Sequence, residues 1–129
     1  MALGMKLAAR ERPVALIVGD GSFLYSPILQ GLGASREHAL PIMIVVLNNR
    51  GYVQMGRSHL YHYPDGAAAN SEHFFGVHIE GPNYGQLAEA LKLTGSRVDR
   101  TSDLISVFRR ARERVSAGET SIVDVQMVK

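Results

Sequence analysis

Two short polar signatures each follow an apolar run rich in β-branched residues. Gly-Asp-Gly-Ser at 19–22 follows the run 14–18, and Asn48-Asn49 follows the run 42–47. An aspartate between glycines lets the backbone approach a ligand closely and leaves N–H groups free for phosphate oxygens. Mg²⁺ prefers carboxylate, amide and carbonyl oxygens and keeps phosphate oxygens in its shell. The signatures together therefore predict a site for a magnesium diphosphate, and they do not suit zinc.

Neither signature is specific by itself, because an aspartate between glycines also occurs in ordinary tight turns. The apolar runs supply the context. Continuous runs of this kind are typical of strands buried on both faces of a parallel sheet, so we predict that 14–18 and 42–47 are the two central strands. Only the 26 residues from Ser22 to Leu47 lie between Gly-Asp-Gly and Asn-Asn. Adjacent parallel strands would bring them together at the carboxyl edge of the sheet, where α/β proteins bind ligands.

The rest of the chain is predicted to continue an α/β order. Ser26 caps a helix that runs from Pro27 to about Ala39. The region 50–81 has little periodicity and is interpreted as a large active-site loop. Asn83 caps the next helix, with Gln86 three positions on, and Gly95 ends that helix.

The last third of the sequence alternates strands and a helix again. We expect a short strand at 97–98 and then a helix capped by Thr101 or Ser102 and stopped by Gly118. A final strand over 122–128 alternates apolar and polar residues, which predicts a place nearer the sheet edge. Residues 1–10 are interpreted as the remnant of a helix.

Composition excludes several classes of function. The chain has 129 residues, a formal net charge of +2 and no cysteine, so disulfides, thiolate nucleophiles and thiolate metal sites are absent. Its size suits one domain, and no run of about 18 apolar residues predicts a membrane helix. The arginines at 109–114 alternate with apolar residues and indicate a solvated helix face rather than a nucleic-acid site. We therefore expect a soluble, cytoplasmic protein that binds neither membrane nor nucleic acid.

Gly-Asp-Gly followed after roughly 25 to 30 residues by Asn-Asn is the signature of thiamine-diphosphate enzymes. The sequence resembles the C-terminal, diphosphate-binding domain of the acetolactate synthase and benzoylformate decarboxylase group. The resemblance spans the chain, from Ala2-Leu3-Gly4 to Val123-Asp124-Val125. It implies an α/β fold, an open three-layer sandwich with a mainly parallel sheet.

Carried over position by position, the resemblance implies that Mg²⁺ is held by the Asp20 carboxylate, the Asn49 side chain and the Gly51 carbonyl. It implies that Asn48 supports the turn. The residues that it implies for contact with the cofactor are Gly19, Asp20, Gly21, Ser22, Tyr25, Asn49, Gly51 and Tyr52.

The resemblance also implies parts that we cannot place in this sequence. In the family, a glutamate on a separate pyrimidine-binding domain activates the cofactor, and a bulky apolar residue holds the cofactor bent. We therefore expect a single domain over 1–129 that lacks its N-terminal part and the pyrimidine domain, with no catalytic residue assigned and no activity alone. A pyrimidine-domain chain or a second copy would be its partner, and a 2-oxo acid its substrate.

Several alternatives stay open. After Asn49 the sequence lacks the Leu-Gly-Met-Val run typical of acetolactate synthases, which keeps a simple 2-oxo acid decarboxylase as an alternative. A non-catalytic module that binds a phosphorylated ligand or docks on a partner protein is another. The region 50–81 also contains histidines and aromatic residues that could hold a metal, contact substrate or only pack the loop: His59, Tyr61, His62, Tyr63, His73, Phe74, Phe75 and His78.

Overall fold

A parallel sheet forms the centre of the protein, as the sequence predicts. The computed structural model describes residues 1–127, and within them the sheet has four strands in the order β1-β2-β4-β3. All neighbouring strands are parallel, and Val45 of β2 pairs with Ile17 of β1 and with Val123 of β4. The α/β class is thereby confirmed. The strands are β1 (Ala15–Gly19), β2 (Met43–Asn48), β3 (Thr94–Val98) and β4 (Ser121–Gln126).

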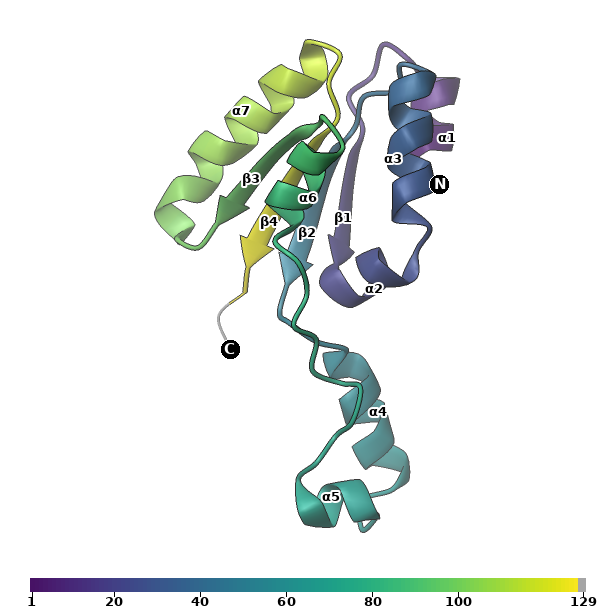
Figure 1. Cartoon of the computed structure of the whole chain (residues 1–129), viewed down its shortest axis with the longest axis vertical. Helices are drawn as coiled ribbons and strands as arrows, with labels where there is room; N and C mark the ends of the chain where they lie inside the picture. Colours follow the sequence, from purple (N-terminus) through teal and green to yellow (C-terminus); the bar gives the residue numbers. More distant parts are fainter. Residues whose placement is uncertain (128–129) are drawn as a thin grey trace.

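Helices cover both faces of this sheet and make three layers (Figure 1). Helix α7 (Leu104–Ser116), which follows the 3-10 turn η1 (Thr101–Asp103), packs on one face. The opposite face carries α1 (Ala2–Ala8), α2 (Asp20–Tyr25), α3 (Ile28–Glu37) and α6 (Tyr84–Ala90). None of the helices in residues 1–127 has both the length and the apolar character that crossing a bilayer requires.

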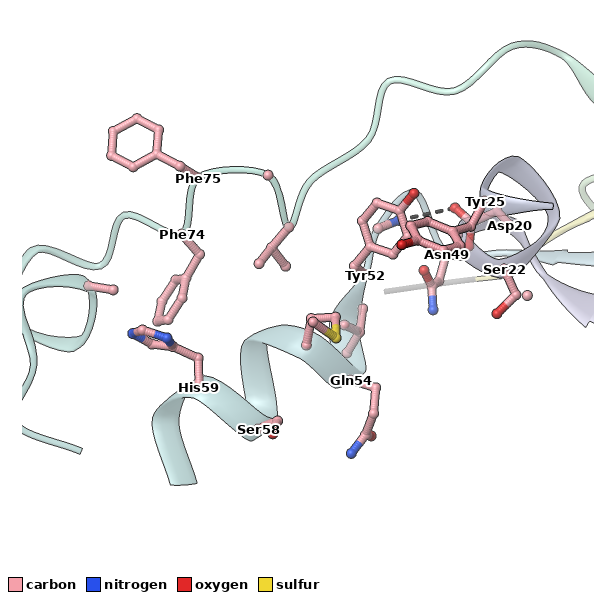
Figure 2. Close-up of a pocket in the computed structure, with 18 of the residues that line it drawn as sticks. Asp20, Ser22, Tyr25, Asn49, Tyr52, Gln54, Ser58, His59, Phe74 and Phe75 are labelled. Carbon is pink, nitrogen blue, oxygen red and sulfur yellow. Dashed lines mark hydrogen bonds between the residues drawn. The ribbon is translucent and has the colours of Figure 1, made fainter. Parts of the chain in front are cut away.

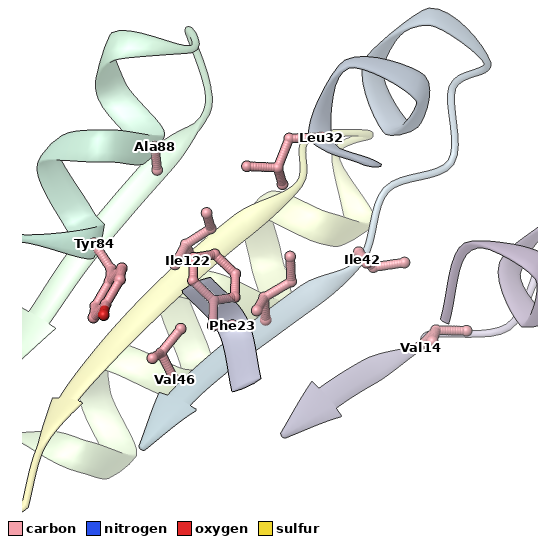
Figure 3. Close-up of a cluster of buried hydrophobic side chains, with 9 residues drawn as sticks. Val14, Phe23, Leu32, Ile42, Val46, Tyr84, Ala88 and Ile122 are labelled. Carbon is pink, nitrogen blue, oxygen red and sulfur yellow. The ribbon is translucent and has the colours of Figure 1, made fainter. Parts of the chain in front are cut away.

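The core is divided between the two faces because successive side chains of a strand point in opposite directions. Ile44 and Val46 of β2 enter one cluster, while Val45 enters the other. In the first cluster, Figure 3 shows the rings of Phe23 and Tyr84 lying together beside Ile122. Their centroids are 5.3 Å apart in an edge-to-face arrangement. Phe23 belongs to α2 and Tyr84 to α6, so this contact joins helices that are distant in sequence.

Residues 50–81, interpreted from the sequence as a loop, form an arm that projects from the α/β body (Figure 1). The arm contains helices α4 (Val53–His62) and α5 (Ala67–Ser71), so the prediction of an irregular loop is wrong in part. An isolated antiparallel bridge between Gly51 and His78 joins the two segments that connect the arm to the body. The helices were missed because in this arm Gly56 is the one buried residue within α4 and α5, and so no apolar stripe marks them.

The lateral order of the strands corrects two predictions. Strand β1, predicted to be central, is an edge strand in the described residues, while β4, predicted near an edge, lies between β2 and β3. Helix α7 covers β2, β3 and β4, and Ile17 of β1 stays 67% exposed on the same face. The polar residues of β4 misled the prediction, because Asp124 is fully buried. Val128, the predicted last residue of this strand, lies outside the described residues.

Helix boundaries show a second group of corrections. Asp20, predicted in a turn, begins helix α2, and the Ser26 hydroxyl donates to Ser22 O instead of capping α3. No side-chain cap starts η1 or α7, contrary to the prediction for Thr101 or Ser102. Helix α6 ends at Ala90, before Gly95, which lies in β3.

Other boundary predictions are confirmed. The Gln86 N–H donates to Asn83 Oδ1 over 3.1 Å, so Asn83 caps α6. Gly118 follows α7 with a φ of 94°, a left-handed conformation that favours glycine at the end of a helix. A helix is present over Ala2–Ala8, and the short strand predicted at 97–98 is the end of β3.

Candidate functional site

The two polar signatures meet at the carboxyl edge of the sheet, because β1 and β2 are adjacent and parallel. Asp20 begins α2 directly after β1 and is 2% exposed. Its Oδ2 accepts a hydrogen bond from Gly51 N–H over 3.1 Å, drawn as a dashed line in Figure 2. In the described part of the chain, this is the one hydrogen bond to the Asp20 carboxylate. The second carboxylate oxygen is therefore left for a ligand.

Asn48 ends the neighbouring strand and Asn49 follows it, and their side chains have different surroundings. Asn48 Oδ1 accepts from Arg50 N–H over 3.1 Å, which supports the turn, as the resemblance implies. Arg50 has a φ of 58°, a left-handed conformation that costs a non-glycine residue about 1 kcal/mol or more. The Asn49 Oδ1 atom is buried and has no hydrogen-bond partner within residues 1–127. An unsatisfied buried amide oxygen costs about 1–3 kcal/mol, which a bound cation would offset.

Gly51 lies where the arm joins the body and has no room for a side chain. A Cβ atom on this residue would lie 2.6 Å from the carbonyl oxygen of Val77. Backbone hydrogen bonds hold together the two segments that connect the arm to the body. They run from Tyr52 N to Val77 O over 2.7 Å and from Ile79 N to Arg50 O over 3.0 Å. The glycine thus allows a close backbone approach that directs Gly51 N–H at Asp20.

Gly21 also faces a close neighbour, the ring of Tyr52. A Cβ atom on Gly21 would lie 2.6 Å from two carbons of this ring. Tyr52 therefore lies against the first turn of α2, as Figure 2 shows beside Asp20 and Asn49. Gly21 and Ser22 belong to this first turn, whose N–H groups have no partner within the helix. These N–H groups are suited to phosphate oxygens.

A cavity of about 1300 Å³ lies between this edge of the body and the arm. Every residue that the resemblance implies for cofactor contact lines it, and the structure so brings together Gly19, Asp20, Gly21, Ser22, Tyr25, Asn49, Gly51 and Tyr52. Toward the arm, the wall includes His59, His62 and His73, whereas His78 is not part of it. Figure 2 shows His59 and Phe74 together, well away from Asp20.

The histidines of the arm do not gather into a metal centre. Within residues 1–127, no group of three or more His, Cys, Asp or Glu side chains is placed to hold a metal. Instead, the His59 ring packs against Tyr63 and Phe74, at centroid distances of 5.3 and 6.2 Å. Phe75 is 94% exposed. The arm thus presents aromatic and imidazole rings to the cavity and to solvent.

Two buried residues near the site were not recognised in the sequence. Asp124 lies at the same edge of the sheet and contacts Asn48, and Tyr84 has its hydroxyl buried without a partner among the described residues. Burial, together with the charges of Asp20 and Asp124 and the nearby Tyr52, raises the pKa of Tyr84 from 10.0 to about 12. A carboxylate inside the apolar run Ile122–Val125 was the one available signal.

Comparison with known proteins supports the family resemblance of the sequence. The profile of the family "Thiamine pyrophosphate enzyme, C-terminal TPP binding domain" matches residues 1–125. The chain is 30% identical over 126 residues to the acetolactate synthase isozyme 3 large subunit of Escherichia coli, covering 96% of this chain and 20% of that protein. Over 51 residues it is 45% identical to a probable pyruvate decarboxylase of Schizosaccharomyces pombe, covering 40% of this chain and 9% of that protein.

Solved structures share the fold. A thiamine diphosphate-dependent 4-hydroxybenzoylformate decarboxylase of Rhodococcus jostii superposes with a TM-score of 0.75 at 24% identity, over 98% of this chain and 22% of that one. Benzoylformate decarboxylase of Polynucleobacter necessarius gives a TM-score of 0.72 at 24% identity, with the same coverage.

The chain spans about a fifth of the length of the acetolactate synthase large subunit and of the two decarboxylases of known structure. Its fold, its paired signatures and the family profile agree over nearly all of its residues. This chain therefore belongs to the thiamine pyrophosphate enzymes, as a C-terminal TPP-binding domain of that family.

Proposed function

We propose that this chain holds thiamine diphosphate through Mg²⁺ and forms the diphosphate side of an acetolactate-synthase-like active site that acts on 2-oxo acids. The observation that carries the proposal is the pairing of two oxygens without partners at one edge of the cavity. They are the buried Asn49 Oδ1 and the Asp20 oxygen that Gly51 N–H leaves free.

The donor set suits magnesium better than a softer metal. Asp20 and Asn49 offer a carboxylate and an amide oxygen, and the Gly51 backbone, which bonds to Asp20, lines the same cavity. Mg²⁺ favours oxygen ligands and is bound in proteins by one or two carboxylates together with substrate phosphates. The described residues offer no cysteine or clustered histidine near this edge that would favour zinc.

The chain's own residues would bind and orient the cofactor. The first-turn N–H groups of Gly21 and Ser22 would bind phosphate oxygens, while Asp20, Asn49 and the Gly51 carbonyl would hold the metal. Tyr52 and Tyr25 enclose the same end of the cavity. The chemistry that thiamine diphosphate supplies when bound is that of an electron sink for carbanions formed next to a carbonyl.

A partner completes the site in this proposal. Because the chain spans about a fifth of its curated relatives, the pyrimidine side would come from another polypeptide or a further part of the protein. The exposed face of β1 supports a partner, since Ile17 is 67% exposed on an edge strand. A pyrimidine-domain chain or a second copy of this one is the occupant that we expect for the complete site.

The proposal is tested by titrating the purified chain with thiamine diphosphate, with and without Mg²⁺, in a calorimeter. We expect heat of binding that requires Mg²⁺ and that Asp20→Asn abolishes, since the amide keeps an acceptor for Gly51 N–H but loses the charge. Asp65→Asn removes a carboxylate in the arm outside the cavity wall and serves as the matched control. Absence of Mg²⁺-dependent heat in the intact fold would refute the proposal and favour a module for another phosphorylated ligand or a docking role.

Incompleteness is tested by activity. With thiamine diphosphate, Mg²⁺ and pyruvate or benzoylformate, we expect this chain alone to give negligible decarboxylation. Turnover should arise only when a chain that supplies the pyrimidine side is added. Clear turnover by the isolated chain would contradict the requirement for a partner.

A simple 2-oxo acid decarboxylase is the second candidate. The segment after Asn49, Arg50 to Met55, lacks the Leu-Gly-Met-Val run, and the 51-residue match at 45% identity is to a probable pyruvate decarboxylase. The products of pyruvate turnover by the completed enzyme distinguish the two. Acetolactate would support the first candidate and acetaldehyde the second.

A further inference from the structure

Asp124 is a fully buried carboxylate on the central strand β4, and its surroundings call for an explanation. Its Oδ1 accepts from Asn48 Nδ2 over 3.0 Å and from Gln126 Nε2 over 2.7 Å, and its Oδ2 accepts from Tyr84 N over 3.3 Å. Neither ion pair in residues 1–127 includes it. A buried carboxylate without a cation is expensive to desolvate, so its presence is not explained by stability.

The contact with Asp124 decides how the Asn48 amide is oriented. N–H groups face both Asp124 oxygens, so the side chain only accepts, and Asn48 must present its NH₂ group to it. The Asn48 carbonyl oxygen is thereby turned toward Arg50 N–H, from which it accepts over 3.1 Å. This bond holds Arg50 in its left-handed conformation. With the amide reversed, two donors would face each other at Arg50.

The residues on either side of Arg50 are Asn49 and Gly51, which the proposed function assigns to the metal. Gly51 N–H in turn reaches Asp20. A second connection runs from Asp124 through Tyr84, whose ring packs on Phe23 of α2, the helix that Asp20 begins. Asp124 therefore contacts the end of β2 directly and reaches α2 only through Tyr84, and it does not itself line the cavity.

We propose that Asp124 is a positioning residue for the magnesium diphosphate site, acting through the Asn48 amide to set the loop 49–51. The inference rests on the proposed function, because the loop is given its purpose by Mg²⁺. Partners that orient metal ligands typically change metal affinity about 10–100-fold when they are replaced.

The first test uses Asp124→Asn, which keeps the shape but places a donor against Asn48 Nδ2 or Tyr84 N–H. We expect Mg²⁺-dependent binding of thiamine diphosphate to weaken about 10–100-fold. Gln126→Ala is the matched control, since it removes another donor to the same carboxylate without touching the loop, and affinity should be unchanged. Equal weakening by both variants would overturn the proposal.

A swapped pair tests the route through Asn48. In Asn48→Asp combined with Asp124→Asn, the introduced amide donates to the introduced carboxylate, whose other oxygen accepts from Arg50 N–H. Groups in direct contact couple energetically, so the double variant should recover about tenfold of the affinity that Asp124→Asn loses. Additive losses of affinity in the double variant would contradict a route from Asp124 through Asn48.

A measurement without ligand makes the test independent of cofactor binding. In the NMR spectrum of the metal-free chain, Asp124→Asn should speed hydrogen exchange at Arg50 N–H and shift the Gly51 amide, and the swapped pair should restore Arg50. A role in stability alone would lower the midpoint of unfolding and leave these amides unchanged in the folded protein, which would overturn the proposal.

A second variant is available if Asp124→Asn fails to fold. Asn48→Ala removes the amide between Asp124 and Arg50 and should give the same faster exchange at Arg50 N–H. If the variants show these effects while the wild type gives no Mg²⁺-dependent binding, the proposed function fails, and the positioning of Asn48 and Arg50 by Asp124 stands.

Discussion

The Gly51 N–H group donates to Asp20 Oδ2 over 3.1 Å and so joins the start of α2 to a residue 31 positions further along the sequence. The bond depends on the absence of a side chain at Gly51, because a Cβ there would lie 2.6 Å from Val77 O, a backbone atom held by Tyr52 N–H. The arm and the proposed metal ligands are therefore built on one close contact.

The first prediction concerns this contact. In Gly51→Ala the new methyl group must push apart the two segments that connect the arm to the body. The variant is then overpacked and also loses the hydrogen bond to the Asp20 carboxylate. We expect the free energy of unfolding to fall by about 3 kcal/mol. Denaturant unfolding followed by circular dichroism would measure it. Gly33→Ala is the matched control, because its Cβ meets nothing within 4 Å on an exposed part of α3. The free energy of unfolding of that variant should rise by up to about 1 kcal/mol from helix propensity. If Gly51→Ala changes the free energy of unfolding no more than Gly33→Ala does, the close contact between Gly51 and Val77 is not needed for stability.

The second prediction concerns Gly21 and Tyr52. In Gly21→Ala the new methyl group would meet the Tyr52 ring at 2.6 Å, and the ring must leave the first turn of α2. We expect a cost of about 1–3 kcal/mol, and a change in Tyr52 fluorescence or ring NMR shifts. In Tyr52→Ala the obstacle is gone, so the same Gly21→Ala change should then cost almost nothing. Equal costs in both backgrounds would place the ring elsewhere in solution.

The third prediction concerns Asn49, whose buried Oδ1 has no partner in the described residues. Asn49→Ala removes an unsatisfied buried oxygen, so the metal-free protein should be unchanged or more stable by up to about 1 kcal/mol. Stabilisation by Mg²⁺ with thiamine diphosphate should disappear, because a ligand raises the unfolding midpoint only in proportion to its binding. Thermal unfolding with and without both ligands measures the two effects together. If the ligands raise the unfolding midpoint of Asn49→Ala as much as that of the wild type, Asn49 is not a metal ligand.

The fourth prediction follows from Tyr84, which is 0% exposed and has its pKa raised to about 12 chiefly by burial. The folded protein favours the protonated phenol, while the unfolded chain releases the proton near pH 10. The contribution to stability is therefore complete below pH 10 and declines as the pH rises toward 12, by roughly 3 kcal/mol in total.

Tyr84→Phe isolates this effect, since other groups that titrate at alkaline pH are common to both proteins. The difference in unfolding free energy between wild type and Tyr84→Phe should be constant from pH 7 to 9. It should then move in favour of Tyr84→Phe as the pH rises above 10. A difference that stays flat to pH 12 would mean that the phenol reaches water in the folded state.

The sequence sufficed for features that depend on neighbouring residues. The β-branched runs predicted β1 and β2, because β-branched residues favour the extended conformation of a strand. The burial that such runs indicate is found in β2 but not in β1, whose side chains stay exposed or half-buried. Asn83 was predicted to cap α6 and Gly118 to end α7, since both signals act within a few residues. The spacing of Gly-Asp-Gly and Asn-Asn also placed the candidate site, because adjacent parallel strands end at the same edge.

Features that depend on distant residues were decided by the tertiary structure alone. The apolar run of β1 cannot reveal that α7 covers only β2, β3 and β4, so its place at an edge was missed. Asp124 was predicted to lie in a strand nearer the sheet edge, because no local pattern shows that Asn48 and the start of α6 supply donors to it. The polar sequence of the arm likewise hides α4 and α5. Residue types and spacing thus determined which residues form the candidate site. Their burial, their hydrogen-bond partners and the strand order arose from contacts between segments that only folding brings together.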